Sequence, residues 1–356
     1  MHRRHILLGG SSTVLSLLLA RSAHASGGFG GPYLLHMHAT GGWDPTLLCD
    51  AKVSGSKFQN QLVSTVVRVN GVPVPESRGG APFSLRYRGH EIESPRDFFQ
   101  RFGSNFLVIN GIDTQTSNHA TGVRITGCGH STANLPALAA LYAGHMARTH
   151  RVPMSFLASG AYDQTGRAVV ASRFPSGIIP YLARPNQFPD PMAPALLPES
   201  VRARIHATRK ARMEALLGSA NARLPRTQRT MSAFQGAAVG DTGGLLERLE
   251  AVATPSFASL ETELFAPARS YLGDKTNPGN PEAPRRLVAI AQPIENILRC
   301  FSAGVSVSAT YAEPGFDTHA NHDATHESAL AMFLLKVRYA LLRAKQLGIA
   351  DKLVLL

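Results

Sequence analysis

The chain has 356 residues, a net charge of +12, 44% apolar residues and 17% charged residues. This balance excludes a disordered chain, and the length suffices for one large domain or two modest ones. Part of the positive charge lies in residues 201–230, which favours anionic partners or simply gives a solvated basic face. No aromatic stacking platform accompanies these residues, so nucleic acid is not expected as a partner.

The first 25 residues are typical of an export signal. Arg3 and Arg4 precede an apolar stretch, and residues 23–25 read Ala-His-Ala, a small-x-small cleavage pattern. The arginine pair favours the twin-arginine export machinery, and the alternative is an ordinary Sec signal that carries two arginines. The apolar stretch is too short and too polar to span a membrane, so no transmembrane span is expected in the mature chain. We therefore predict a periplasmic or secreted protein, cleaved near Ala25.

Strands and helices alternate along the remainder, which we expect to form a single domain over residues 26–356. Expected strands cover residues 32–39, 106–111, 152–158 and 305–312, and expected helices cover residues 135–149, 286–303 and 326–349. Residues 52–95 read as a short-stranded excursion, and residues about 200–270 as a helical, basic insertion. The pattern predicts an α/β fold with a mostly parallel sheet and helices on both faces. The final LVLL reads as the opening of a buried strand, so we expect the natural chain to continue beyond Leu356.

Three polar clusters directly follow expected strands, at residues 41–44, 113–131 and 317–319. In parallel sheets, ligands bind at the carboxyl ends of the strands. Asp317 and His319 can point the same way from one tight loop, and Asp44 can add a carboxylate from another strand end. Carboxylates and imidazoles are ligands for zinc. Of two ions ~4 Å apart, one can activate the nucleophile that attacks an ester while the other holds the leaving oxygen. The alternative for Asp317 and His319 is an ordinary polar turn.

Two more histidines lie in the same stretch, which reads PGFDTHANHDATH over residues 314–326. His322 and His326 stand four positions apart and would share one face of a helix, a weaker indication of metal binding. The 113–131 segment offers Ser117 and Thr121 as nucleophiles, with Asn118 and Arg124 nearby to hold an anion. The alternative is that these are ordinary turn and cap residues.

The leader, GGWDPTLL after the first strand, NHATGVRITG and GFDTHANH together resemble the DUF1501 family of exported bacterial proteins. That family looks like a branch of the alkaline phosphatase/sulfatase superfamily. The resemblance implies a three-layer α/β/α fold of alkaline phosphatase type and a two-metal hydrolytic site. It matches Asp44, Asp317 and His319 to metal ligands, with His322 as a rival, and Ser117 or Thr121 to the nucleophile. The superfamily's remaining ligands lie after a further strand, beyond Leu356.

These observations predict an exported metal-dependent hydrolase of phosphate or sulfate esters. Its cofactor would be a divalent metal, zinc first and manganese or calcium as alternatives, and its substrate a small anionic ester. The alternative is a non-catalytic envelope protein that keeps the fold and binds a ligand. A third reading is an interaction module that needs no metal.

Overall fold

The computed structural model describes residues 29–150, 152–173, 197–218 and 282–356, with single residues at 248, 249, 252, 268 and 271. The predicted export signal over residues 1–25 lies outside the described residues. So does most of the predicted basic insertion beyond residue 218. Among the described residues, no helix is both long enough and apolar enough to cross a membrane.

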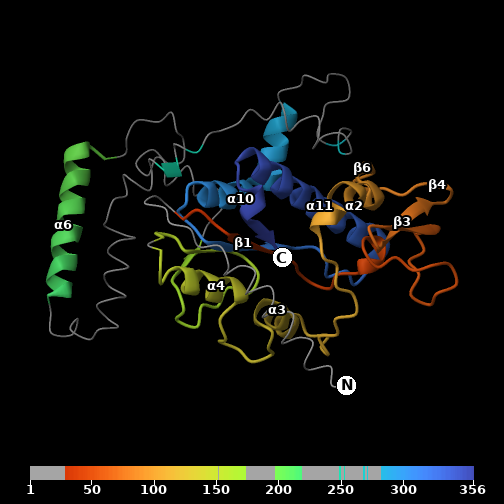
Figure 1. Ribbon diagram of the computed structural model, residues 1–356, viewed down its shortest axis with the longest axis horizontal. Coiled ribbons are helices and arrows are strands. Elements are labelled where there is room, and N and C mark those ends of the chain that lie inside the picture. The colour runs from red at the N-terminus through yellow and green to blue at the C-terminus, as the bar shows by residue number, and fades with distance from the viewer. Residues whose placement is uncertain are drawn as a thin grey trace.

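A five-stranded parallel sheet forms the centre of the fold, with strand order β10-β1-β9-β7-β8 (Figure 1). Its strands are β1 (Tyr33–Ala39), β7 (Phe156–Ser159), β8 (Ala171–Arg173), β9 (Ser308–Glu313) and β10 (Leu353–Leu355). The prediction of an α/β fold with a parallel sheet is confirmed. The final LVLL does form a strand, whereas β8 was not anticipated in its proline-rich surroundings.

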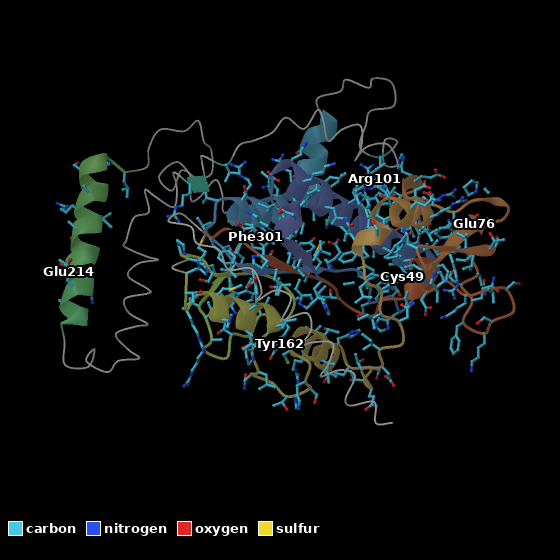
Figure 2. The ribbon with its side chains drawn as sticks, in the orientation of Figure 1. Cys49, Glu76, Arg101, Tyr162, Glu214 and Phe301 are labelled. Carbon is cyan, nitrogen blue, oxygen red and sulfur yellow. The ribbon has the colours of Figure 1, made fainter. Side chains whose placement is uncertain are left out.

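Helices cover both faces of this sheet. Side chains alternate along β9, so its contacts with two helices show which face each helix covers. Ser308 donates its hydroxyl hydrogen to the carbonyl of Ala139 in α4 (Leu138–Met146) on one face. On the other face, Lys336 of α11 (His322–Gln346) bonds Tyr311 and Glu313. A third helix, α10 (Glu282–Ser302), packs against α11 and β9. Figure 2 places Phe301, which is fully buried, at this packed centre.

The excursion predicted over residues 52–95 forms short antiparallel strands, which is confirmed. They are β2 (Thr65–Val69), β3 (Val72–Arg78), β4 (Ala81–Pro82), β5 (Leu85–Tyr87) and β6 (His90–Glu93). Two ion pairs fasten them to α11, a buried one between Glu93 and Arg338 and a partly buried one between Arg78 and Glu327. Helix α2 (Pro95–Phe102) then begins at Ser94, whose hydroxyl accepts the backbone N–H of Asp97. The described residues also form short 3-10 turns, which are η1 (Pro45–Leu47), η2 (Gly103–Asn105) and η4 (Ala350–Lys352).

The strand predicted over residues 106–111 is wrong. Leu107 and Ile109 are 80% and 64% exposed, and only Phe106 and Val108 pack partly on the core. The apolar run therefore contacts the body along one edge and pairs with none of the described strands. A short apolar run does not reveal whether a neighbouring strand is available to it, and so its composition misled.

Helix α6 (Glu199–Leu217) bears out the start of the predicted helical insertion. It stands apart from the sheet at the left of Figure 1, and Figure 2 shows Glu214 on it away from the core side chains. Its exposed residues include Arg204 and Arg212. This agrees with a solvated basic face.

Candidate metal centre

The carboxyl ends of β1 and β9 bring two of the predicted polar clusters together. The backbone N–H of Phe316 donates to the carbonyl of Thr40, so the loop after β1 lies against the loop after β9. Gly41 has φ of 120°, and a Cβ on it would lie 2.4 Å from the backbone nitrogen of Asp317. Only glycine fits this position, both for its backbone conformation and for the space available. The two loops therefore approach as closely as backbone allows.

Asp317 is the centre of an exposed cluster that also contains His119 and His319. The Nε2 atoms of His319 and His119 lie 2.8 Å and 3.3 Å from the same carboxylate oxygen, Oδ1 of Asp317. Around a tetrahedral zinc ion, with bonds of ~2 Å, ligand atoms stand ~3.3 Å apart. The three ligand atoms all lie within 4.8 Å of one another, so small side-chain adjustments would allow one ion to bind all three.

His119 reaches the exposed cluster because it opens α3 (His119–Cys128), a helix that the sequence pattern did not predict. Asn118 caps that helix, and its side-chain oxygen accepts the backbone N–H of Thr121. His119 lies within the polar 113–131 segment, but the sequence pattern did not assign it as a ligand. The cap residue directly before it was the one available signal, because a capped helix start fixes where the next side chain lies.

The predicted ligands Asp44 and His322 form a second group, which we call the bonded cluster, together with Thr318 and His326. Nε2 of His322 lies 3.2 Å from Oδ2 of Asp44, and Nδ1 of His322 lies 2.6 Å from Oγ1 of Thr318. Both ring nitrogens of His322 thus have protein partners. The structure does not bring Asp44 and His322 into the group of ligand atoms around Asp317.

His326 is fully buried and holds the loop after β1 in place. Its Nε2 accepts the backbone N–H of Asp44 at 3.0 Å, and its ring stacks on His322 with centroids 4.9 Å apart. Burial lowers the pKa of His326, and the neighbouring Asp44 carboxylate opposes this only in part. His326 therefore acts as a neutral acceptor that positions Asp44, and the four-residue spacing noticed in the sequence serves this purpose.

Asp44 is fixed by its own turn as well. Its Oδ1 accepts the backbone N–H of Thr46 at 2.9 Å and the hydroxyl of Thr46 at 2.7 Å, which leaves Oδ2 for His322. Burial raises the pKa of Asp44, but the two hydrogen bonds from Thr46 and the contact with His322 outweigh it, so the pKa is lowered. The carboxylate is therefore ionised at neutral pH.

The predicted nucleophiles and anion-binding residues all lie in or beside the first two turns of α3. Ser117 is exposed just before the cap, and Thr121 is half-buried on the first turn. Each stands two positions from His119. Asn118 uses its side-chain oxygen as the cap, and Arg124 donates to the carbonyl of Ser131. These contacts leave the predicted roles of the four residues as predictions.

Comparison of the chain with protein-family models, with curated proteins and with solved structures gives no match. The resemblance to the DUF1501 family and to the alkaline phosphatase/sulfatase superfamily therefore stays a prediction.

Proposed function

We propose that the protein binds one divalent cation, zinc in the first place, through His119, Asp317 and His319, and uses it to hydrolyse a phosphate or sulfate ester. The observation that carries this proposal is the convergence of two imidazole nitrogens on one carboxylate oxygen. Two histidines and a carboxylate leave the fourth position of a tetrahedral ion for water or substrate, which is the arrangement of catalytic zinc sites. Such an ion lowers the pKa of bound water and polarises an ester oxygen.

The surroundings fit an anionic substrate. His119 opens α3, and the N–H groups at the start of a helix favour negative charge. A hydroxyl at Ser117 or Thr121 would then attack the ester, or the metal-bound water would do so directly. The proposed location is the periplasm or the outside of the cell, which depends on the predicted export signal.

One observation favours a second function, a non-catalytic envelope protein that binds its ligand through the metal. The side chains of His119, Asp317 and His319 are 53%, 46% and 83% exposed. Active sites are usually more enclosed, because catalysis gains from excluding water. An open metal site suits the recognition of a ligand at the protein surface.

The test is metal content by elemental mass spectrometry, followed by assays with p-nitrophenyl phosphate and p-nitrophenyl sulfate. We expect about one equivalent of zinc per chain and zinc-dependent release of p-nitrophenol. Asp317→Ala should abolish both, whereas Asp323→Asn, a change six positions away, should leave both intact. Stoichiometric zinc without hydrolysis would favour the binding protein. Folded protein that takes up no zinc, manganese or calcium would overturn the metal centre.

A further inference from the structure

The bonded cluster has an arrangement that metal binding does not require. It consists of a hydroxyl, an imidazole and a carboxylate in a row, from Thr318 through His322 to Asp44. We propose that these three residues form a second reactive centre, in which Thr318 is an activated nucleophile for carboxylic esters. This centre goes beyond the proposed metal-dependent activity and works without the ion.

The hydrogen-bond directions follow from the chemistry of the three groups. An ionised carboxylate can only accept, so Nε2 of His322 carries the hydrogen that faces Oδ2 of Asp44. A neutral imidazole then has its lone pair on Nδ1, which accepts the hydroxyl hydrogen of Thr318 at 2.6 Å. A nucleophile within hydrogen-bond reach of a base, with the base oriented by a third group, is the general pattern of covalent catalysis.

The surroundings hold this row in place. Thr46 occupies the other carboxylate oxygen of Asp44, and His326 accepts the backbone N–H of Asp44. The ring of His322 stacks on His326, one turn further along α11. Each member is therefore fixed before any substrate arrives, as a catalytic group needs to be.

A substrate can reach the row from solvent. Thr318 is half-buried, and 42% of the side chain of His322 is exposed. By contrast, the imidazole of His326, one turn on, is completely enclosed and makes no such contact with a hydroxyl. The reactive ends of the row, the hydroxyl and the base, are thus its accessible part.

The charge near the row favours an uncharged carbonyl over a phosphate dianion. Asp44 is ionised, and its carboxylate lies 3.2 Å from the ring of His322. Like charges at this range repel an anionic substrate. On the exposed cluster, a bound cation would reverse this preference. The two sides of the 317–319 segment would therefore serve different substrate classes.

The proposed reaction has two stages, acylation of Thr318 and hydrolysis of the acyl group. The oxygen of Thr318 adds to the ester carbonyl, and its proton passes to Nδ1 of His322, where Asp44 stabilises the resulting imidazolium. The bond from the carbonyl carbon to the alkoxy oxygen then breaks, the alcohol leaves with the proton from His322, and Thr318 carries the acyl group. Water hydrolyses this ester by the same proton route, which releases the acid and restores the hydroxyl.

The experiment treats the full chain, after a chelator has removed metal, with p-nitrophenyl acetate and locates the acetyl group by peptide mass spectrometry. The reaction is quenched with acid within the first turnover, which traps the acyl form before water hydrolyses it, and we expect one acetyl group, on Thr318. His322→Ala should slow acetylation at least about 100-fold, and Asp44→Asn at least about tenfold. Thr318→Val should abolish it, and Thr318→Ser should retain it. Thr325→Val, which removes an exposed threonine on the first turn of α11, is the matched control and should acetylate as the wild type does.

Circular dichroism of each variant establishes that it is folded, so that a lost acetyl group reflects chemistry. The proposal is overturned if folded wild type gains no acetyl group beyond that of Thr318→Val. It is also overturned if the acetyl group appears on Ser117 or Thr121, or if the chelator abolishes the reaction. If Thr318 only positions His322, the acetyl group would appear on a residue other than position 318 in the wild type and in Thr318→Ser, and that result would also overturn the proposal.

Discussion

The segment from residue 317 to residue 326 supplies two neighbouring clusters that differ in how their side chains are held. In the exposed cluster, His119, Asp317 and His319 contact one another at the surface. In the bonded cluster, backbone and side-chain partners account for His322, both oxygens of Asp44 and Nε2 of His326. Residues one position apart therefore take part in different clusters, since Asp317 and His319 contact His119 or each other while Thr318 contacts His322.

The largest expected effect comes from Gly41→Ala, which would force the loop after β1 away from the loop after β9. A Cβ at this position would overlap the backbone of Asp317, and alanine would also strain a φ of 120°. Strain and overpacking together should cost about 4 kcal/mol. Gly42→Ala is the matched control, because its φ of 132° brings similar strain but its nearest contact is 3.7 Å away. Urea unfolding measures both, and equal losses would contradict the close approach of the loops.

The next effect concerns His36, a buried histidine in the middle of β1. Burial, with a smaller contribution from His38, lowers the pKa of His36 to about 4. The unfolded chain, with a pKa near 6.5, binds the proton more tightly, so stability is lost as the pH falls from 6.5 to about 4. The loss should reach roughly 3 kcal/mol. His36→Gln should remove that part of the acid sensitivity.

Urea unfolding at several pH values between 7.5 and 4 measures this effect. His130→Gln serves as the control, because His130 is exposed. If His36→Gln keeps the same acid sensitivity as the wild type, then His36 is not the group responsible.

A smaller effect is expected for His326→Leu. The change leaves the backbone N–H of Asp44 without its acceptor in a half-buried position, which should cost about 2 kcal/mol. The same experiment on His319→Ala should show a loss within about 0.5 kcal/mol, because an exposed side chain is removed. Thermal unfolding with both variants tests the contrast. Similar losses for the two would mean that the clusters do not differ in how firmly they are built.

The smallest effect is expected for zinc affinity when the bonded cluster is changed. His322→Ala should alter the zinc dissociation constant by less than about twofold, whereas His119→Ala should weaken binding at least about tenfold, as loss of a direct ligand does. Isothermal titration gives both constants. A reversed order would restore the original prediction that Asp44 and His322 belong to the metal site.

Much of the fold follows from sequence pattern. Strand β1, the helix over α11 and the carboxyl-end placement of Asp44 and Asp317 were predicted because apolar periodicity and turn residues are local signals. The sequence pattern failed for the exposed run at Leu107 and Ile109, because pairing depends on a neighbouring strand and not on composition. It also failed for α3, where glycines and threonines weaken the helical signal but the Asn118 cap starts a helix.

The site was predictable in its residue types but not in its grouping. Asp44, Asp317, His319 and His322 were all expected in one place, and all four do lie near the ends of β1 and β9. Their division into two clusters depends on the direction of each side chain and on which partner it contacts: His322 contacts Asp44, whereas His319 contacts Asp317. His119 comes from α3, whose distance from the loop after β9 no spacing rule gives. For this reason, the ligand role of His119 and the nucleophile role of Thr318 depend on the three-dimensional structure.

The position of β1 has a consequence for how the protein folds. This strand belongs to the N-terminal part of the chain, yet both of its neighbours, β9 and β10, come from residues 308–355. The hydroxyl of Thr40 bonds the carbonyl of Glu313, 273 positions later. Contacts so distant in sequence slow folding, because a long loop must close before the contact forms. During synthesis, β1 would have neither neighbour until β9 has been made, so its apolar residues would be open to aggregation over that interval.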